Sequence, residues 1–219
     1  MSNYNLPNGS SAQLSKLWGK SNSVTGISNA ANAVVTLSAA DDSIKAGDIV
    51  MLRSAWIHLD GFVCRVKAVK DLTVTLDDVD TTDTVYFPEG GGAGTLTKVN
   101  EFIDFPPVTA IAASGGDQQT TSFQALQMDK AENLNTFKNA STQTYTITHD
   151  SADEIRPILK QADKSQDLIV VKFYNPRSTE TRLYSAKVSF NEIPATEINQ
   201  VETVQIVFSL KSDMKFYKG

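Results

Sequence analysis

The stretch ETRLYSAKVSFNEIPATEINQVETVQIVFSL, residues 180–210, decides the fold class of this chain. Apolar side chains alternate with others along both of its halves, and successive side chains of a β-strand point to opposite faces of a sheet. One face of the two halves carries Arg182, Tyr184, Ala186, Val188, Phe190, Val204, Ile206, Phe208 and Leu210. Residues 191–200 are too many for a two-residue turn, so we expect a hairpin with an open loop or a strand extension. Taken alone, the stretch is typical of the last hairpin of any antiparallel sheet.

The part of the chain before this stretch adds further strands. Short β-type runs separated by turn residues fill residues 33–99 and are typical of a small barrel or sandwich. Residues 108–128 predict a second hairpin, because an apolar run and an alternating run flank a Gly-rich turn. We expect residues 129–140 to be a polar loop and residues 142–148 to be a strand.

One helix is predicted at about residues 152–163. Ser151 and Glu154 match a capping box, which supplies hydrogen-bond partners at the start of a helix. The apolar residues that follow at helical spacing are Ile155, Ile158, Leu159 and Ala162. The order of many strands, one helix and three more strands predicts a mainly β fold, an antiparallel sandwich or barrel with one flanking α-helix.

The chain divides into three parts by composition. Residues 1–32 are rich in Ser and Asn and predict an N-terminal arm, residues 33–99 a small β-rich subdomain, and residues 100–219 the main core. The only sizeable apolar cluster of the arm is formed by Leu14, Leu17 and Trp18. Such an arm docks on a neighbouring subunit through its aromatic anchor, or it is a frayed terminus, and both interpretations stay open.

Composition narrows the function classes. The formal net charge is −5 and no basic tract is present, so we expect no tight grip on nucleic acid, although a non-basic wall lets nucleic acid pass. The single Cys64 cannot form an internal disulfide, and its place in an apolar run predicts a core residue. No apolar run approaches the roughly 20 residues that span a bilayer, and no secretory signal is recognised, so we expect synthesis in a cytoplasm.

The sequence contains no recognisable catalytic or metal-binding motif. His58 and His149 lack a His or Cys partner at ligand spacing. The acidic residues 77–83 lack the register of a calcium loop, so a solvated acidic turn is favoured over a calcium site. Residues 90–94 lack the Lys and Ser/Thr of a phosphate loop. We therefore predict no catalytic residues, no metal and no cofactor, and a protein that is not an enzyme.

A series of short motifs runs from about residue 33 to the end of the chain. In order, they are Ala46-Gly47-Asp48-x-Val50, Trp56 with Leu59-Asp60-Gly61, Arg65-Val66 before Thr73-Val74-Thr75-Leu76, Asp80-Thr81-Thr82-Asp83, Phe87-Pro88, Gly94, Ser114-Gly115-Gly116-Asp117-Gln118-Gln119, and Ser189-Phe190-Asn191-Glu192-x-Pro194. Through the order and spacing of these motifs the chain resembles the major tail tube proteins of long-tailed, non-contractile bacteriophages.

The resemblance implies both an architecture and a set of partners. Proteins of this family have a β-sandwich core with a flanking helix and assemble as hexameric rings that stack into a hollow tube. The tube surrounds a tape-measure protein and later passes DNA without binding it specifically. The resemblance also implies contacts with a tail terminator and with distal tail proteins, a place in the virion tail, and no membrane.

Two sets of residues are expected to make the assembly. Residues 108–128 and 181–210 are predicted to form the inner wall, because long amphipathic strands with open edges invite pairing with the next subunit. The residues expected on the lumen or the subunit seam are Gln118, Gln119, Thr121, Ser185 and Ser189. The residues expected at contacts between subunits or rings are Leu14, Leu17, Trp18, Glu89 and Gly91.

The main alternative is a carbohydrate- or receptor-binding β-sandwich module of a virion. Such a module requires exposed aromatic side chains on loops, and the sequence offers Trp56 and Tyr86 as the few candidates. An enzyme on a β scaffold is the third interpretation, because distant strands can assemble a site that no motif reveals.

Overall fold

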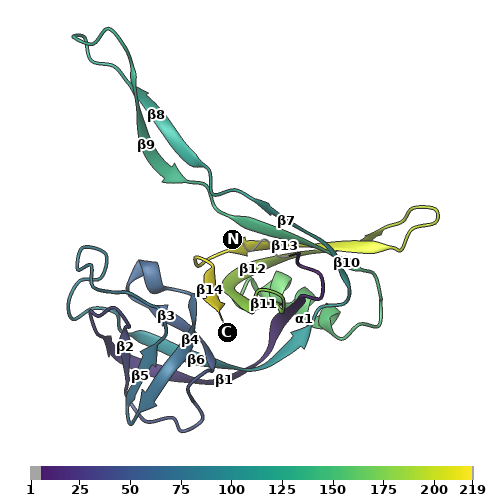
Figure 1. Cartoon of the computed structure of the whole chain (residues 1–219), viewed down its shortest axis with the longest axis horizontal. Coiled ribbons are helices and arrows are strands. Elements are labelled where there is room, and N and C mark those ends of the chain that lie inside the picture. Colours follow the sequence, from purple (N-terminus) through teal and green to yellow (C-terminus); the bar gives the residue numbers. More distant parts are fainter. Residues whose placement is uncertain (1–5, 219) are drawn as a thin grey trace.

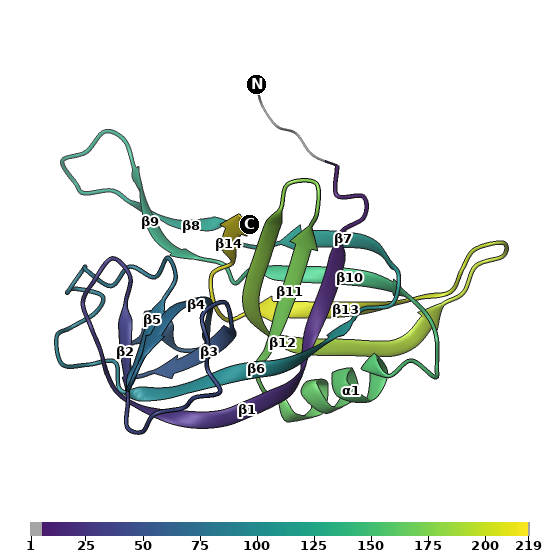
Figure 2. The same cartoon turned by 60° about the horizontal axis from the view of Figure 1, so that its bottom comes forward.

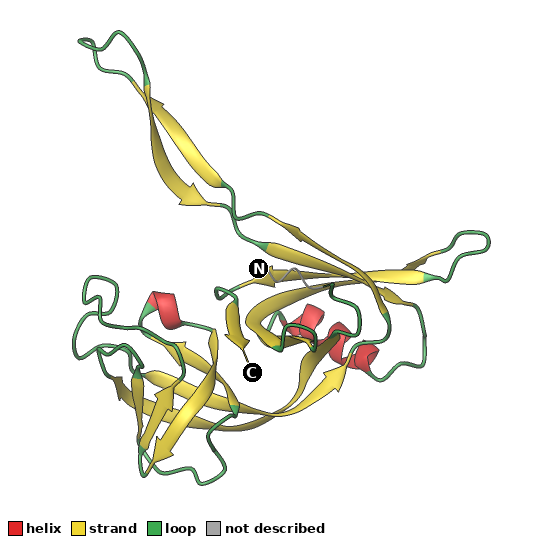
Figure 3. Ribbon diagram, viewed as in Figure 1, coloured by secondary structure: helices red, strands yellow, loops and turns green. Residues whose placement is uncertain are grey.

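The regular secondary structure of the chain is almost entirely β-strand, as the alternating patterns predicted (Figure 1). The computed structural model describes residues 6–218. Within these residues one α-helix and one short 3-10 helix interrupt the strands (Figure 3). The elements are β1 (Ser11–Ile27), β2 (Val34–Leu37), β3 (Ile49–Ser54), η1 (Ile57–Leu59), β4 (Phe62–Lys70), β5 (Thr73–Leu76), β6 (Gly94–Asp104), β7 (Val108–Ser114), β8 (Gln118–Phe123), β9 (Glu132–Lys138), β10 (Thr142–Thr148), α1 (Ile155–Ser165), β11 (Ile169–Asn175), β12 (Glu180–Ala195), β13 (Thr203–Leu210) and β14 (Lys215–Lys218).

The first six strands close into a small barrel. β1 pairs with both β2 and β6, and the remaining pairings run β2–β5–β4–β3–β6, so every strand of the ring has two neighbours. Alternate positions of these strands fill the interior with Val35, Leu37, Val50, Leu52, Cys64, Val66, Val74, Leu76 and Leu96. The β-rich unit expected in residues 33–99 is therefore a barrel, but its ring is complete only with β1.

A curved antiparallel sheet lies beside the barrel, in the order β6–β1–β11–β12–β13–β10–β7 (Figure 2). Residues 180–210 are the hairpin β12–β13. Between its two halves an open loop or a strand extension was expected, and the structure shows both, because β12 continues to Ala195 and a loop then leads to Thr203. The apolar face predicted for this hairpin is buried in the main core with Tyr184, Ala186, Val188, Phe190, Val204, Ile206 and Phe208. Helix α1 covers this core by packing against β12.

The N-terminal segment is not an arm outside the fold, and that prediction was wrong for the described residues. β1 pairs with β11, β6 and β2, which places it inside both the sheet and the barrel. Its two buried polar side chains are bonded, since the Ser15 hydroxyl accepts from the Val170 amide (3.0 Å) and Asn22 donates to Asp41 (2.6 Å). Residues 1–5 of the predicted arm lie outside the described residues.

The helix lies slightly later than expected and begins differently. It spans Ile155–Ser165 instead of 152–163, and the position before it is Glu154, whose side chain makes no capping bond. The Asp153 carboxylate accepts from the Ile155 amide at 2.9 Å instead, so the predicted capping box of Ser151 and Glu154 is wrong. The predicted apolar stripe is confirmed by the burial of Ile155, Leu159 and Ala162.

The second hairpin has a different pairing from the one predicted. Residues 108–114 and 120–128 do not pair with each other, because β7 pairs with β10 and β8 pairs with β9. The expected polar loop at residues 129–140 contains β9. The β8–β9 hairpin is a sheet of its own, inserted between β7 and β10 and extending away from the body (Figure 1).

The barrel and the sheet meet along two shared strands. β1 and β6 run through both, so the predicted domain boundary between residues 99 and 100 falls inside the continuous strand β6. A third apolar cluster fills the junction with Val63, Val99, Val170, Leu183 and Tyr217. Tyr217 comes from β14, a short strand that pairs with β12 and ends the described chain.

Candidate assembly surfaces

The strand β7 forms an open edge of the curved sheet. It pairs with β10 on one side, and no described strand pairs with its other side. All of its residues except Val108 are exposed, among them Ile111 at 41%. An unpaired edge presents free backbone N–H and C=O groups that a strand of another chain can complete. β7 is therefore a candidate surface for contact between subunits.

The β8–β9 hairpin is amphipathic although its own chain covers neither of its faces. Its register pairs Phe123 with Glu132 and Thr121 with Leu134, so Phe123 and Leu134 share one face. The other face carries Thr120, Ser122, Asn133 and Asn135. Phe123 is 52% exposed and Leu134 47%, and Leu126 at the tip is fully exposed. An isolated two-stranded hairpin is marginally stable in water. We therefore expect the β8–β9 hairpin to be stabilised by contact with another surface.

A second projection is the far end of the β12–β13 hairpin. Its exposed apolar side chains are Ile193, Ile198 and Val201, each more than two thirds exposed. Figure 1 shows this end and the β8–β9 hairpin leaving the body in different directions. The molecule therefore offers two apolar projections on separate sides, an arrangement that suits a subunit with neighbours on more than one side.

A groove of about 890 Å³ lies between the start of β1 and the edge strand β7. Its floor includes the core residues Tyr145 and Tyr184, whose hydroxyls are hydrogen-bonded to each other at 3.2 Å. Burial raises the pKa of both phenols, so they stay neutral at physiological pH. The Arg182 guanidinium also lines the groove, with its side chain 39% exposed and its Nε 2.6 Å from the Glu180 carboxylate. The groove thus combines apolar walls with polar groups, among them the Arg182 guanidinium and the Asp104 carboxylate.

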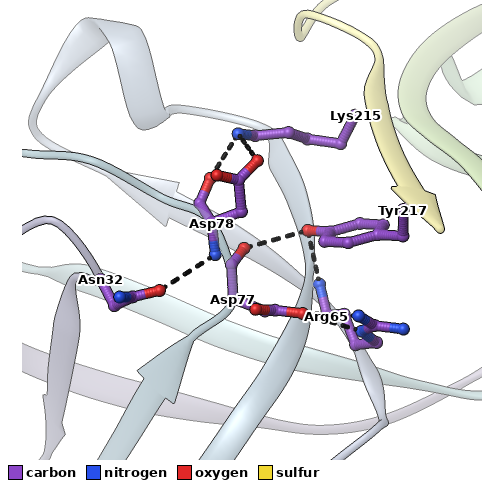
Figure 4. A network of polar contacts seen from close by, with 6 residues as sticks. All are labelled: Asn32, Arg65, Asp77, Asp78, Lys215 and Tyr217. Atoms are coloured by element: carbon purple, nitrogen blue, oxygen red, sulfur yellow. Dashed lines mark hydrogen bonds and ion pairs between the residues drawn. The ribbon is translucent and has the colours of Figure 1, made fainter. Parts of the chain in front are cut away.

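A polar network fastens β14 to the barrel (Figure 4). The Tyr217 hydroxyl accepts from the Arg65 amide (3.1 Å) and donates to the Asp77 carbonyl (3.2 Å), and the Arg65 guanidinium lies 4.7 Å from the Tyr217 ring centre. The Arg65 side chain also donates twice to the Asp77 carboxylate, at 2.7 and 3.0 Å. The Lys215 ammonium donates to the carbonyl and carboxylate of Asp78. Two acidic residues of the run 77–83, Asp77 and Asp78, therefore have partners within the chain. The sequence alone predicted only a solvated acidic turn there.

The residues predicted for the lumen are separated by the structure. Gln118, Gln119 and Thr121 lie on β8, whereas Ser189 is exposed on β12. Ser185 is fully buried, and its hydroxyl donates to the Gly61 carbonyl in the barrel of the same chain. Its predicted placement on an open face was therefore wrong. The sequence could not reveal this because the barrel covers only the first part of the polar face of β12.

The residues predicted for contacts between subunits also differ in their accessibility. Leu14 is fully buried in the main core, so it cannot reach another chain, while Leu17 is 53% exposed. Trp18 packs at the junction of barrel and sheet. Glu89 is exposed, but a Cβ at Gly91 would overlap the indole of Trp56, which shows that the glycine loop lies against that ring.

Neither histidine nor the acidic run is arranged as a metal site. His149 Nδ1 lies 3.0 Å from the Arg156 guanidinium, and the His58 ring contacts the edge of Tyr86. Across residues 6–218 no group of three His, Cys, Asp or Glu side chains is close enough together to hold a metal ion. Trp56, one of the two aromatics that a sugar-binding module would use, is 5% exposed in the barrel core, which weakens that alternative.

Comparison with known proteins decides the family. Residues 54–219 match the family described as phage tail tube protein, TTP. The chain belongs to the phage tail tube protein family. It is thus a structural component of a phage tail, and the resemblance proposed from its sequence motifs is confirmed.

The tail tube match begins at the end of β3, so β1 and β2 lie outside it. Among solved structures, one similar chain comes from a six-fold symmetrised cryo-EM structure of the anti-feeding prophage (AFP) baseplate. The two chains are 11% identical with a TM-score of 0.36, over 55% of the tail tube chain and 86% of the other. No curated protein matches the chain.

No helix in residues 6–218 is long and apolar enough to cross a membrane.

Proposed function

We propose that this tail tube protein forms hexameric rings that stack into a hollow tube. The observation that carries the proposal is the edge strand β7, which is open along its whole length in a sheet that is otherwise fully paired at this end. Pairing of this edge with the next subunit around a ring removes the open edge, and contacts between two different surfaces that close by rotation give a ring.

We further propose that the sheet formed by β12, β13, β10 and β7 lines the lumen. In their register, the side chains facing away from the core are Lys187, Ser189, Asn191, Gln205, Val207, Ser209, Thr142, Thr144, Thr146, Ser114, Ala112 and Ala110. Lys187 is the single charged residue in this set. A small, almost uncharged surface would hold neither phosphates nor a protein strongly, which suits a passage for DNA and a tape-measure protein.

The proposed partners follow from this role. Subunits would be made in the bacterial cytoplasm and assemble around a tape-measure protein, with a terminator at one end and distal tail proteins at the other. Electron microscopy of the purified protein tests the oligomer. Six-fold rings or hollow tubes are expected, whereas discrete single subunits that bind glycans would favour the receptor-binding alternative and overturn the proposal.

The lumen assignment has its own test. The substitutions Ser189→Lys and Gln205→Lys add positive charge to the proposed wall, and DNA ejection from phage carrying them should slow while tube length stays normal. The matched control places the same added charge on the barrel with Ser38→Lys and Ser23→Lys, at two exposed serines, and ejection should then be unchanged. Normal ejection from the Ser189→Lys and Gln205→Lys phage would show that another face lines the lumen.

A further inference from the structure

We propose that Asn8 is a site of spontaneous covalent modification, at which the side-chain amide is lost and an isoaspartyl or aspartyl residue forms. The reaction uses the backbone nitrogen of the next residue, and Asn8 is the single asparagine of the chain that is followed by glycine. The site lies in the turn before β1 of each separate subunit, so the inference goes beyond the proposed ring and does not depend on it.

The reaction is an attack within the chain. The Gly9 amide nitrogen forms a bond to Cγ of Asn8 while the bond from Cγ to Nδ2 breaks. Ammonia leaves with the proton that the Gly9 nitrogen gives up, and a five-membered cyclic imide remains. Water then opens the imide at the former side-chain carbonyl, which gives aspartate, or at the former backbone carbonyl, which gives isoaspartate. Water is therefore the only co-reactant.

The local structure leaves the attacking nitrogen free. The Ser10 amide donates to the Pro7 carbonyl at 3.0 Å, which closes a four-residue turn with Asn8 and Gly9 at its centre. Gly9 has a φ of +85° and the φ of Asn8 is not positive, a combination typical of a type II turn. The hydrogen bond of such a turn joins the first and fourth residues and does not use the amide of the third. Within residues 6–218 no hydrogen bond engages the Gly9 amide or the Asn8 side chain.

The turn is also free to change its shape. Asn8 and Gly9 are exposed, and they precede β1, which begins at Ser11. Glycine has no Cβ, so nothing on residue 9 shields its nitrogen, and its backbone adopts many conformations. Even an added Cβ at Gly9 would come only within 3.8 Å of Pro176, so no tight packing holds the turn. Rotation of the Asn8 backbone toward attack therefore breaks one turn hydrogen bond and no strand pairing.

Two comparable positions are protected by the fold. Asn22 lies within β1 with 5% exposure, and its Nδ2 donates to the Asp41 carboxylate at 2.6 Å. Aspartate before glycine forms the same imide with loss of water, and Asp60 and Gly61 are such a pair. The Gly61 amide, however, donates to the Leu52 carbonyl at 2.9 Å, so its nitrogen is held away from attack. The structure thus favours residue 8 over both positions.

The modification changes the charge of the groove beside β7. Asn8 lines this groove, and the charged residues of the lining are Asp104 and Arg182, one of each sign. A new carboxylate at residue 8 gives the lining a second negative charge and leaves it net negative. Isoaspartate also adds one carbon atom to the backbone just before β1. An altered subunit therefore differs from a fresh one next to the open edge of the sheet.

Storage of the purified subunit in warm, mildly alkaline buffer tests the site. Mass spectrometry of peptides should show at residue 8 the mass gain that accompanies replacement of NH₂ by OH. A protein isoaspartyl methyltransferase should transfer labelled methyl groups to the same peptide. Asn8→Gln should abolish both signals, because its longer side chain would have to close a six-membered ring.

A matched control separates the effect of the fold from that of the dipeptide. Ser23→Gly places a glycine after the buried Asn22, which should stay unmodified while Asn8 of the same chain converts. No mass gain at residue 8 after prolonged storage, or equal gains at residues 8 and 22 of the Ser23→Gly protein, would overturn the inference. The reaction takes place within one subunit, so either result leaves the proposed ring untouched, and failure of ring assembly leaves this site untouched.

Discussion

Cys64 shows how burial alone can set the chemistry of a residue. It lies fully buried in the barrel, and this burial raises the pKa of its thiol from 9.0 to about 12. The nucleophilic form of cysteine is the thiolate, so Cys64 should not react with thiol reagents in the folded protein. We expect labelling to follow global unfolding. Rapid labelling of the native subunit at pH 7.5 would contradict this.

The same pKa shift makes stability depend on pH. The unfolded thiol loses its proton near pH 9, while the folded thiol keeps it until about pH 12, so the free energy of unfolding falls as pH rises through this window. Burial also raises the pKa of Tyr145, Tyr184 and Tyr217, which adds a fall of the same sign at higher pH. A Cys64→Ala variant should therefore lose stability less steeply between pH 9 and 11 than the unaltered protein. Urea unfolding at several pH values measures both slopes, and parallel slopes would refute the prediction.

Tyr217 is the residue that joins the end of the chain to the barrel. Tyr217→Phe keeps the ring in its apolar cluster but removes both hydrogen bonds of the hydroxyl, leaving the Arg65 amide and the Asp77 carbonyl without this partner. We expect a loss of about 2 kcal/mol in the free energy of unfolding. Tyr86→Phe, at a 56% exposed tyrosine, is the control and should change stability by less than about 0.5 kcal/mol. Equal effects of the two substitutions would contradict a role for the network.

At the scale of elements, the hairpin β12–β13 could be predicted and the strands β1 and β9 could not. β12 and β13 bury one whole face, so their apolar side chains alternate without interruption. β1 has register shifts along its pairing with β6 and buries Ser15 and Asn22, which breaks the period of two. β9 is exposed throughout, so its composition is that of a loop. Helix α1 was predicted from its stripe, but the bond that starts it comes from Asp153, which lies between the two residues of the expected motif.

The root of the β8–β9 hairpin depends on one glycine. Gly115 has a φ of +82°, and an added Cβ would overlap the Ala140 carbonyl. Gly115→Ala should therefore change the direction in which the hairpin leaves the sheet, at a backbone cost of roughly 1–2 kcal/mol before the overlap is counted. Assembly should weaken at least tenfold while the barrel is unaffected, as measured by light scattering and by amide exchange. Gly26→Ala is the control, because no atom lies within 4 Å of its added Cβ. Normal assembly by the Gly115→Ala protein would show that the hairpin direction is unimportant.

At the scale of the whole molecule, no pattern in the sequence indicates that the barrel and the sheet share strands. A closed barrel needs β1 to pair with β2 at one end and with β6 along its length, and the pairing with β6 joins residues far apart in the chain. Local patterns report which face of a strand is buried, but not which strand lies beside it. The polar face of β12 shows the consequence, since Ser185 is covered by the barrel and Ser189 is not. The surfaces that assemble the tail therefore follow from topology as much as from composition.

We expect the strand β14 to decide whether the molecule unfolds as one unit. It pairs with β12 of the sheet, and its Lys215 and Tyr217 bond to the barrel, so it ties the two separate apolar cores together. Removal of residues 213–219 deletes this tie but keeps the bonds of Ser212 to Ser185. We expect the truncated subunit to melt in two transitions, one for the barrel and one for the sheet, where the full chain melts in one. Scanning calorimetry with tryptophan fluorescence separates them, because Trp56 lies in the barrel core. A single transition that is merely shifted to lower temperature would mean that the shared strands β1 and β6 couple the two cores without help from β14.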